Sequence, residues 1–147
     1  MEKQRCGWCK GDALYETYHD QEWGVPLKDD DKLFEFLILE TFQAGLSWIT
    51  ILKRREGFRQ AFENFEIEKV AGFDANKIED LMLDPGIIRN RAKIISAINN
   101  ANIVLDKELD LTQLIWSHAP AVRQTPAENF TWRATSDESE ALSKTLR

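Results

Sequence analysis

Hydrophobic residues recur along most of the chain at intervals of three and four positions, the spacing that places side chains on one face of a helix. Sustained alternation of β-branched residues, which would indicate strands, is nearly absent. No internal repeat, low-complexity tract or Pro- and Gly-rich linker divides the sequence. The pattern therefore predicts an all-α protein in which residues 1–147 form one compact helical domain.

The central part of the chain predicts two consecutive helices. The first begins at Asp29 or Asp30, whose side chains can cap a helix, and ends at Gly45. Ser47 caps the second, which Glu56-Gly57 is expected to interrupt before the apolar face resumes. The residues expected to turn inward are Leu33, Phe34, Leu37, Ile38, Phe42, Trp48, Ile51, Leu52, Phe58 and Phe62.

The second half predicts further helices separated by turn residues. Asp74 caps a helix that ends at Asp84-Pro85-Gly86, and a longer helix follows this turn. A long loop from Pro120 to Trp132 is expected to wrap around the body, and a capping box at residues 135–138 opens a last helix. The apolar positions of these helices are Ile78, Leu81, Ile87, Ile94, Ile95, Ile98, Val104, Leu111, Leu114 and Ile115.

The charge balance is acidic, with 19 Lys and Arg against 25 Asp and Glu and a formal net charge of −6. This balance argues against a protein that coats nucleic acid without specificity, because phosphate binding depends on clustered cations. Segments 53–59 and 89–93 are basic although the chain as a whole is acidic, and each has a net charge of +3. Charge alone leaves open whether they bind phosphate or form solvated helix faces.

The expected location is cytoplasmic, and no membrane partner is expected. The longest apolar run, residues 36–39, is far shorter than a membrane span, and the N-terminus lacks the apolar stretch of a secretory signal. The two cysteines, Cys6 and Cys9, are too close in sequence to staple a fold. Free thiols or metal ligands are the alternatives.

Residues 81–95 have the outline of a helix-hairpin-helix motif, with a helix, the Pro85-Gly86 turn and a second helix that opens with cations. In that motif, backbone N–H groups of the hairpin and of the next helix's first turn face a DNA phosphate. Such contacts position a protein without reading sequence. The usual second glycine is replaced by Ile88, so an ordinary turn between two helices stays an alternative.

Glu40 stands among apolar residues near a predicted helix end, where an unpaired buried carboxylate would be costly. It either rotates into water, pairs with an arginine, or lines a pocket that binds a cation. Aromatic residues in adjoining segments favour the pocket, since rings beside a carboxylate suit a flat cation. Tyr15 and Tyr18 are three positions apart and share a helix face. Core packing is the alternative for the aromatic set Trp8, Tyr15, Tyr18, Trp23 and Trp48.

Cys6 and Cys9 have the Cys-x2-Cys spacing of zinc ligands, and His19 could supply a third. The only other histidine is His118. Because a structural zinc site needs four ligands, two inert thiols explain the pattern equally well.

Taken together, these motifs resemble one known family, the bacterial 3-methyladenine DNA glycosylase I enzymes of constitutive alkylation repair. The combination of Glu40 and Gln43-Ala44-Gly45-Leu46-Ser47-Trp48 with His19-Asp20-x-Glu22-Trp23-Gly24-Val25-Pro26 is highly specific. The matching stretches run in order along nearly the whole chain. They are residues 5–8, 18–20, 22–26, 39–40, 43–50, 52–53, 55–56, 86–89, 93–94 and approximately 139–146.

The resemblance implies a helix-hairpin-helix enzyme that flips N3-methylated adenine out of duplex DNA and hydrolyses its glycosidic bond. It implies that Glu40, the catalytic-site carboxylate, contacts the base edge, while Tyr18 and Trp48 stack on the base and Tyr15 lies alongside. Trp8 and Trp23 complete the aromatic set. Leu46 would fill the gap left in the duplex. The residues expected to hold the DNA backbone are Gly86, Ile87, Arg89, Arg91 and Lys93.

The implied chemistry agrees with these residue types. Methylation at N3 makes adenine cationic and weakens the glycosidic bond, because the base departs neutral. Little acid catalysis is then needed, and the main task is selection after base flipping. Whether Glu40 also assists the attacking water or stabilises the oxocarbenium-like sugar stays open. Asp106 is the nearest candidate for the catalytic Asp of the wider superfamily and is expected to be a surface residue.

The sequence also departs from the family pattern. The family joins its termini through a zinc ion whose N-terminal ligands match Cys6 and His19, while the C-terminal His and Cys would lie beyond Arg147. The chain is therefore expected to be C-terminally truncated relative to the family, with two of four zinc ligands. A monomer without an organic cofactor is expected, which acts on alkylated double-stranded DNA and releases 3-methyladenine. The alternatives are a non-catalytic or inactivated DNA-binding protein of the same fold, or a metal-stabilised interaction domain.

Overall fold

The architecture is known from a computed structural model that describes residues 3–120 and 134–147. Within these ranges the chain forms helices and no strand, which confirms the predicted all-α fold. The loop predicted from Pro120 to Trp132 lies, beyond its first residue, outside the described part. The helices are η1 (Gly7–Cys9), α1 (Ala13–Gln21), α2 (Asp30–Gln43), α3 (Trp48–Ala61), η2 (Glu63–Phe65), α4 (Ile67–Ala71), α5 (Ala75–Leu83), α6 (Arg91–Asp106), α7 (Leu111–Trp116) and α8 (Asp137–Thr145), where η marks a 3-10 turn.

Short polar side chains close the N-termini of the helices at the positions that the sequence indicates. Asp29, Ser47 and Asp74 each accept a hydrogen bond from the backbone amide of the third residue of the helix that follows. A capping box opens α8, as predicted, but it joins Ser136 to Ser139 and so lies one residue later than the predicted box at 135–138. These local caps explain why α2, α3 and α5 begin where they were predicted to begin, and why α8 begins within one residue of its predicted start.

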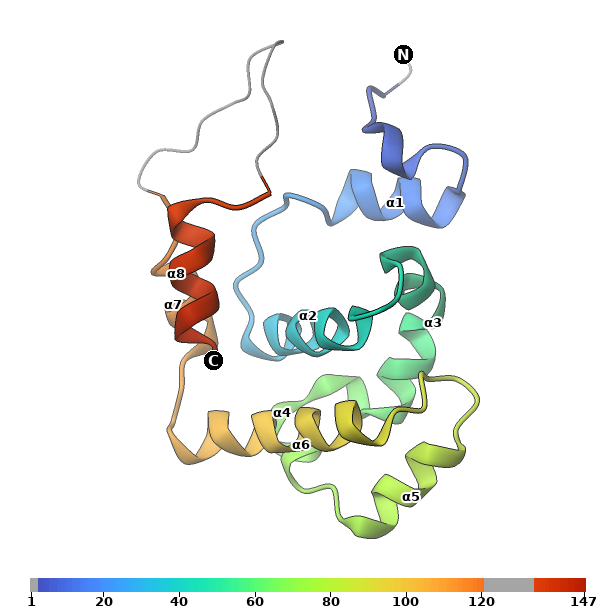
Figure 1. The fold of residues 1–147 in the computed structure, drawn as a ribbon, viewed down its shortest axis with the longest axis vertical. Coiled ribbons are helices and arrows are strands. Elements are labelled where there is room, and N and C mark those ends of the chain that lie inside the picture. Colours follow the sequence, from blue (N-terminus) through green and yellow to red (C-terminus); the bar gives the residue numbers. More distant parts are fainter. Residues whose placement is uncertain (1–2, 121–133) are drawn as a thin grey trace.

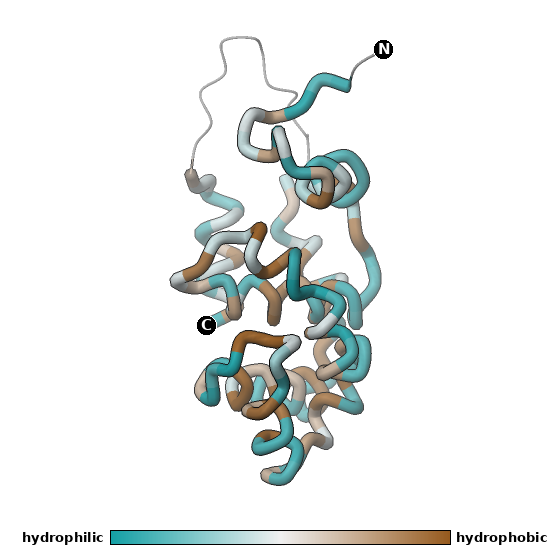
Figure 2. The backbone as a smooth tube through the Cα atoms, turned by 90° about the vertical axis from the view of Figure 1, so that its right-hand side faces the viewer, coloured by the Kyte–Doolittle hydropathy of each residue, from teal (hydrophilic) through white to brown (hydrophobic). Residues whose placement is uncertain are grey.

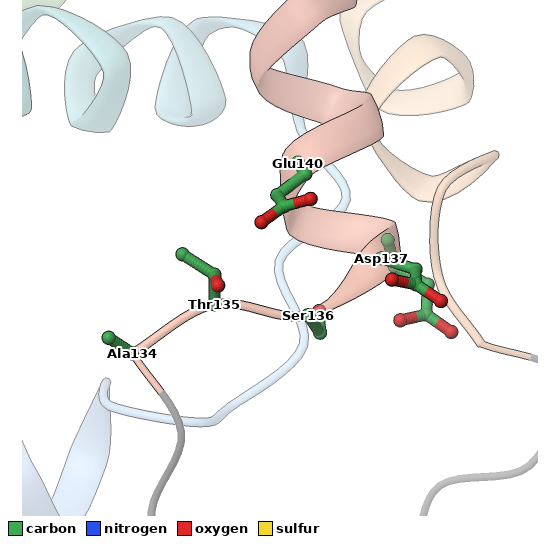
Figure 3. A pocket seen from close by; sticks show the side chains of 6 residues that line it. Ala134, Thr135, Ser136, Asp137 and Glu140 are labelled. Carbon is green, nitrogen blue, oxygen red and sulfur yellow. The ribbon is translucent and has the colours of Figure 1, made fainter.

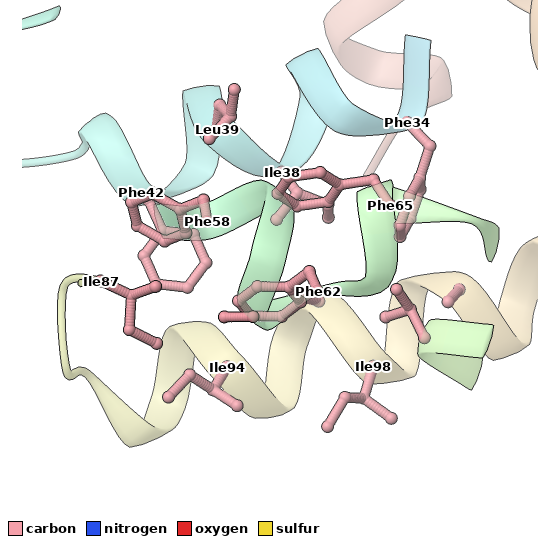
Figure 4. Packing of buried hydrophobic residues seen from close by; sticks show 14 of the residues in the cluster. Phe34, Ile38, Leu39, Phe42, Phe58, Phe62, Phe65, Ile87, Ile94 and Ile98 are labelled. Carbon is pink, nitrogen blue, oxygen red and sulfur yellow. The ribbon is translucent and has the colours of Figure 1, made fainter. Parts of the chain in front are cut away.

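The hydrophobic core lies where α2, α3, η2 and α6 meet (Figure 4). The rings of Phe42 and Phe58 pack edge to face with centroids 4.8 Å apart, and those of Phe62 and Phe65 are stacked at 5.3 Å. Ile94 closes the core from α6 and is fully buried. This packing holds α2 and α3 against each other, and these two helices carry Glu40 and Trp48.

Two details of the predicted helices are wrong. The expected break at Glu56-Gly57 is absent, because α3 runs without interruption from Trp48 to Ala61. Gly57 serves a tertiary contact instead: a Cβ at this position would lie 2.2 Å from the carbonyl oxygen of Gly86. Ile95, expected to be buried, is 46% exposed, because one residue of helix turns it about 100° away from Ile94.

The N-terminal segment lies beside this helical body rather than within it. Figure 1 shows η1 and α1 at one end of the molecule, joined to α2 by an extended stretch. Figure 2 shows hydrophobic residues gathered mainly in the body, whereas the N-terminal segment is largely hydrophilic. None of the helices in the described ranges is long and apolar enough to span a membrane.

Candidate functional site

The N-terminal segment carries a cluster of aromatic rings around Trp8. The cap Asp12 accepts a hydrogen bond from the Tyr15 amide and starts α1, which places Tyr15 and Tyr18 one turn apart. The Trp8 ring lies 4.9 Å from Tyr15, 6.4 Å from Tyr18 and 5.4 Å from Trp23, between centroids. Trp8 and Trp23 are each 42% exposed, so the cluster is open to solvent and is not part of the core.

Tyr18 connects this cluster to the helical body. Its ring lies 5.8 Å from that of Trp48, the first residue of α3, with the planes tilted by 57°. Burial raises the pKa of Tyr18, and the negative charge of Glu40 raises it further, whereas the neighbouring Trp48 indole opposes the shift. The indole Nε1 of Trp48 is buried and makes no hydrogen bond of good geometry within the described residues. The Trp8 cluster and the Trp48 ring therefore both lie against Tyr18, and the charge of Glu40 acts on it.

Glu40 lies in the last turn of α2 and is accessible to solvent as a whole residue. Its carboxylate is nevertheless partly desolvated, and this burial raises its pKa. Within the described part of the chain its carboxylate forms no ion pair with an arginine or lysine and no hydrogen bond, and burial is the only cause of its pKa shift. An unpaired carboxylate beside Tyr18 is suited to a cationic or hydrogen-bond-donating ligand.

A pocket of about 300 Å³ adjoins the aromatic cluster. Tyr18, Trp23 and Phe36 line it, and Phe36 lies one turn before Glu40 on α2, although Glu40 itself is not part of the lining. Another hollow, of about 480 Å³, lies at the start of α8 and is lined by Asp137 and Glu140 (Figure 3). It contains none of the predicted site residues, and its carboxylates would repel phosphate.

The hairpin between α5 and α6 packs against α3, as Figure 1 shows. Arg54 donates from Nη1 to the carbonyl oxygens of Pro85 and Ile87, at 3.2 and 3.4 Å. The Gly86 amide donates to Oδ1 of Asp84 at 2.7 Å, so this N–H is used within the hairpin. Ile87 is 2% exposed and belongs to the core, which confirms that it turns inward, although it precedes α6; the predicted DNA contact of its side chain is wrong.

The cations predicted to hold phosphate have three different environments. Arg89 is exposed and forms no ion pair with any described residue. Arg91 forms two hydrogen bonds to Glu79, of 2.6 and 3.1 Å, on an exposed surface. Lys93 donates instead to the carbonyl oxygens at the end of α2. The structure thus leaves Arg89 and Arg91 exposed at the surface, whereas the partly buried Lys93 is bonded to the end of α2.

Leu46, predicted to enter the duplex, lies in a tight turn between α2 and α3. Gly45 adopts φ of +83°, a conformation that glycine tolerates and other residues rarely adopt. The turn is closed by hydrogen bonds from Leu46 N to Gln43 O and from Gln43 Nε2 to Leu46 O, at 2.7 and 2.6 Å. Leu46 itself is partly buried against the core.

Cys6 and His19 lie next to each other, and the Cys6 amide donates a hydrogen bond to His19 Nε2 at 3.4 Å. The other ring nitrogen, Nδ1, is 3.0 Å from the carboxylate of Asp20. Cys9 donates its thiol to the carbonyl oxygen of Cys6, and burial raises the pKa of this thiol, which favours an inert side chain. The described residues contain no group of three or more His, Cys, Asp or Glu placed to bind a metal. Two donors do not make the four-ligand set of a structural zinc site.

Helix α3 also holds the aromatic cluster in place, a role that the sequence did not predict. Arg55 forms two hydrogen bonds to the Glu22 carboxylate, of 2.6 and 2.8 Å, and its side chain is only 13% exposed. Glu22 is the C-cap of α1, and Tyr18 lies one turn earlier. The +3 charge of segment 53–59 was the available signal, yet charge alone could not reveal which partner Arg55 takes.

Disrupting this ion pair is expected to loosen the aromatic cluster. Arg55→Ala should lower the free energy of unfolding by about 1–2 kcal/mol. Hydrogen bonds to charged groups can contribute more than this, but the partial exposure of Glu22 weakens these two. A double-mutant cycle with Glu22→Ala, measured by urea unfolding, should give a coupling energy of about 1 kcal/mol. Strict additivity of the two substitutions would show that the pair contributes nothing.

The helical body, with a hairpin packed on α3 and aromatic rings gathered at one end, defines an all-α protein of the kind seen in DNA glycosylases of known structure. The chain belongs to the methyladenine glycosylase family, whose model matches residues 8–147. It is 46% identical to DNA-3-methyladenine glycosylase 1 of Escherichia coli K12, over 98% of this chain and 80% of that protein. It is 42% identical to DNA-3-methyladenine glycosylase of Haemophilus influenzae, over 97% and 80%.

Solved structures of the same family share the fold. A crystal structure of 3-methyladenine DNA glycosylase I superposes with a TM-score of 0.86 and 40% identity, over 97% of this chain and 81% of that one. A variant of 3-methyladenine DNA glycosylase I in complex with 3-methyladenine gives a TM-score of 0.82 and 36% identity, over 96% and 78%. The predicted resemblance is therefore confirmed at the level of family and fold.

Proposed function

We propose that this protein is a DNA-3-methyladenine glycosylase, which removes N3-methylated adenine from alkylated double-stranded DNA. The observation that carries the proposal is the partly desolvated carboxylate of Glu40, which has no ion-pair partner among the described residues and whose charge acts on Tyr18 of the Tyr18–Trp48 ring pair. Such a site prefers a flat cation to a neutral purine of the same shape. The family membership and the relatives named above support the same activity.

The proposed reaction is hydrolysis of the bond between the methylated base and the sugar. The base enters the site from a flipped nucleotide and lies against Tyr18 and Trp48, with Glu40 at its edge. The glycosidic bond breaks with its electron pair moving to the base, which cancels the positive charge and releases neutral 3-methyladenine. Water supplies the new C1′–O bond and loses a proton to solvent. Glu40 is proposed to bind the cationic base before cleavage and then to stabilise the positive charge that develops on the sugar as the base departs neutral.

On the DNA side, Arg89 and Arg91 are the proposed phosphate ligands, and the hairpin at Gly86 is the proposed contact with the backbone. Leu46 is proposed to fill the gap that the flipped nucleotide leaves. Tyr15, Trp8 and Trp23 extend the aromatic wall around Tyr18.

No step is assigned to zinc, since the described residues supply only Cys6 and His19. Metal analysis of the purified protein tests the zinc prediction. The monomeric state and cytoplasmic location stay predictions.

The proposal is tested by incubating the protein with duplex DNA treated with a methylating agent and measuring released bases by chromatography. Free 3-methyladenine should appear, and an unmethylated duplex of the same sequence should release no adenine. Titration of free 3-methyladenine, followed by tryptophan fluorescence, should saturate. Binding of alkylated duplex without any base release would instead indicate the non-catalytic DNA-binding protein considered from the sequence.

A further inference from the structure

We propose that Lys93 is a positioning residue that ties the first turn of α6 to the Gln43–Leu46 turn, and that it is not a phosphate ligand. The inference rests on the proposed glycosylase function. It concerns how the distance between the hairpin and the proposed base-binding site is fixed, since both are proposed to contact the same DNA.

The contacts of the ammonium group carry the first step. Nζ of Lys93 donates to the carbonyl oxygens of Ala44 and Phe42, at 2.7 and 3.0 Å. Both carbonyls belong to the C-terminal end of α2, whose last turn contains no basic residue of its own. A cation is favourable at a helix C-terminus, where carbonyls lack partners within the helix.

The position of Lys93 in its own helix supports the same conclusion. It is the third residue of α6, where the helix dipole disfavours a positive charge, and its own amide donates to the cap Asn90. The ammonium is therefore placed by its partners on α2, since α6 by itself would favour an acidic residue there. Two of the three N–H groups of the ammonium are occupied by these carbonyls.

The turn that Lys93 holds joins the two parts of the proposed site. Glu40 precedes it on α2, Trp48 follows it on α3, and Leu46 lies within it. The other end of the connection is the first turn of α6, which begins at Arg91. Lys93 therefore sets the distance between the proposed phosphate contacts and the side chain proposed to enter the duplex. Its loss should leave phosphate binding intact and impair base insertion.

The experiment compares Lys93→Met with Arg91→Ala and with Lys107→Met, the same substitution at the exposed far end of α6. Lys93→Met should keep the affinity for undamaged duplex and the slope of that affinity against salt, and lower the single-turnover excision rate by about tenfold or more, as for lost hydrogen bonds to a charged group. Arg91→Ala should lower the affinity and reduce the salt slope by about one unit. Lys107→Met should change neither quantity.

Two further measurements do not depend on catalysis. Amide hydrogen exchange in residues 43–47 should rise in Lys93→Met and stay unchanged in Arg91→Ala. Gly45→Ala, which strains the same turn at φ of +83°, should reproduce the excision loss with normal duplex affinity. Circular dichroism checks that each variant is folded.

The proposal is overturned if Lys93→Met weakens duplex binding and flattens its salt dependence as Arg91→Ala does, because Lys93 would then contact phosphate. It is equally overturned if exchange at residues 43–47 does not change. A wild-type protein that releases no 3-methyladenine would refute the proposed function instead. The hydrogen-exchange comparison would still decide whether Lys93 holds the turn.

Discussion

Replacing Glu40 by glutamine is expected to lower the rate of 3-methyladenine excision by about 100-fold or more, a loss typical of removing one preorganised electrostatic group from an active site. Glutamine keeps the size of the side chain and an acceptor oxygen, so the substitution tests the charge alone. The measurement is single-turnover release of 3-methyladenine from methylated duplex at saturating enzyme. Glu56→Gln, at a carboxylate 76% exposed on α3, is the matched control and should excise at the normal rate.

The pH dependence follows from the direction of the Glu40 pKa shift. Partial burial raises the pKa, so the required carboxylate is lost on acidification at a higher pH than for an ordinary glutamate. Excision should fall as the pH drops through this raised pKa, and the Glu40→Gln variant should lack that acidic limb. A limb that persists in the variant would assign the titration to another group.

Stability should change in the opposite sense from activity. Between the ordinary and the raised pKa of Glu40, the folded protein binds more protons than the unfolded chain, so this group contributes less stability as the pH rises. At neutral pH the ionised carboxylate is destabilising, and Glu40→Gln should melt at or slightly above the wild-type temperature. A clearly lower melting temperature would mean that Glu40 supports the fold, and the activity loss would then not report on the site.

Substituting alanine at Gly57 is expected to be the most destabilising single change in the hairpin region. The added Cβ would lie 2.2 Å from the carbonyl oxygen of Gly86 and 2.9 Å from its carbonyl carbon. Both atoms are backbone, so the overlap is relieved only by moving the hairpin away from α3. We expect a loss of about 3 kcal/mol and a fall in Tm of roughly 6–12 °C, the range for overpacking in a protein of this size.

The same substitution should also weaken duplex binding, because the hairpin loses its place on α3. Gly72→Ala is the control: its Cβ would lie 3.5 Å from the nearest backbone oxygen, an ordinary contact, and its φ is negative. That variant should melt within about 2 °C of wild type, as expected for a surface change of at most about 0.5 kcal/mol. Wild-type stability in Gly57→Ala would show that the hairpin does not pack closely on α3.

Local signals predicted the helices well where one side chain closes a helix end. Asp29, Ser47 and Asp74 act on the next three residues, so their effect can be inferred without knowledge of the fold. Gly57 shows the opposite case. Within its own segment it suggests a break, whereas the structure uses it inside a continuous helix because the Gly86 backbone approaches there.

For the candidate site, too, some features could be inferred from the sequence and others only from the fold. The residue types near Glu40 indicated a carboxylate among aromatic rings, and the structure places the Tyr18 and Trp48 rings 5.8 Å apart, while their stacking on a base stays a prediction. The partners of the cations could not be inferred. Arg55 pairs with Glu22 over 33 positions, and Lys93 reaches Phe42 over 51. A long cationic side chain can reach several carbonyls or carboxylates. Its actual partner depends on how the helices pack, and the sequence of neither helix alone specifies that packing.

The amino-acid sequence by itself determined the helical class, the starts of α2, α3 and α5, and the set of chemically capable side chains, and its resemblance to known sequences indicated the family. The helical class and the helix starts depend on spacing or on interactions between neighbours in the chain. The tertiary structure decided which of those side chains meet and which are already engaged, as Lys93 is at the end of α2. The physical reason is that contacts between distant segments form only after the core has fixed the relative positions of the helices.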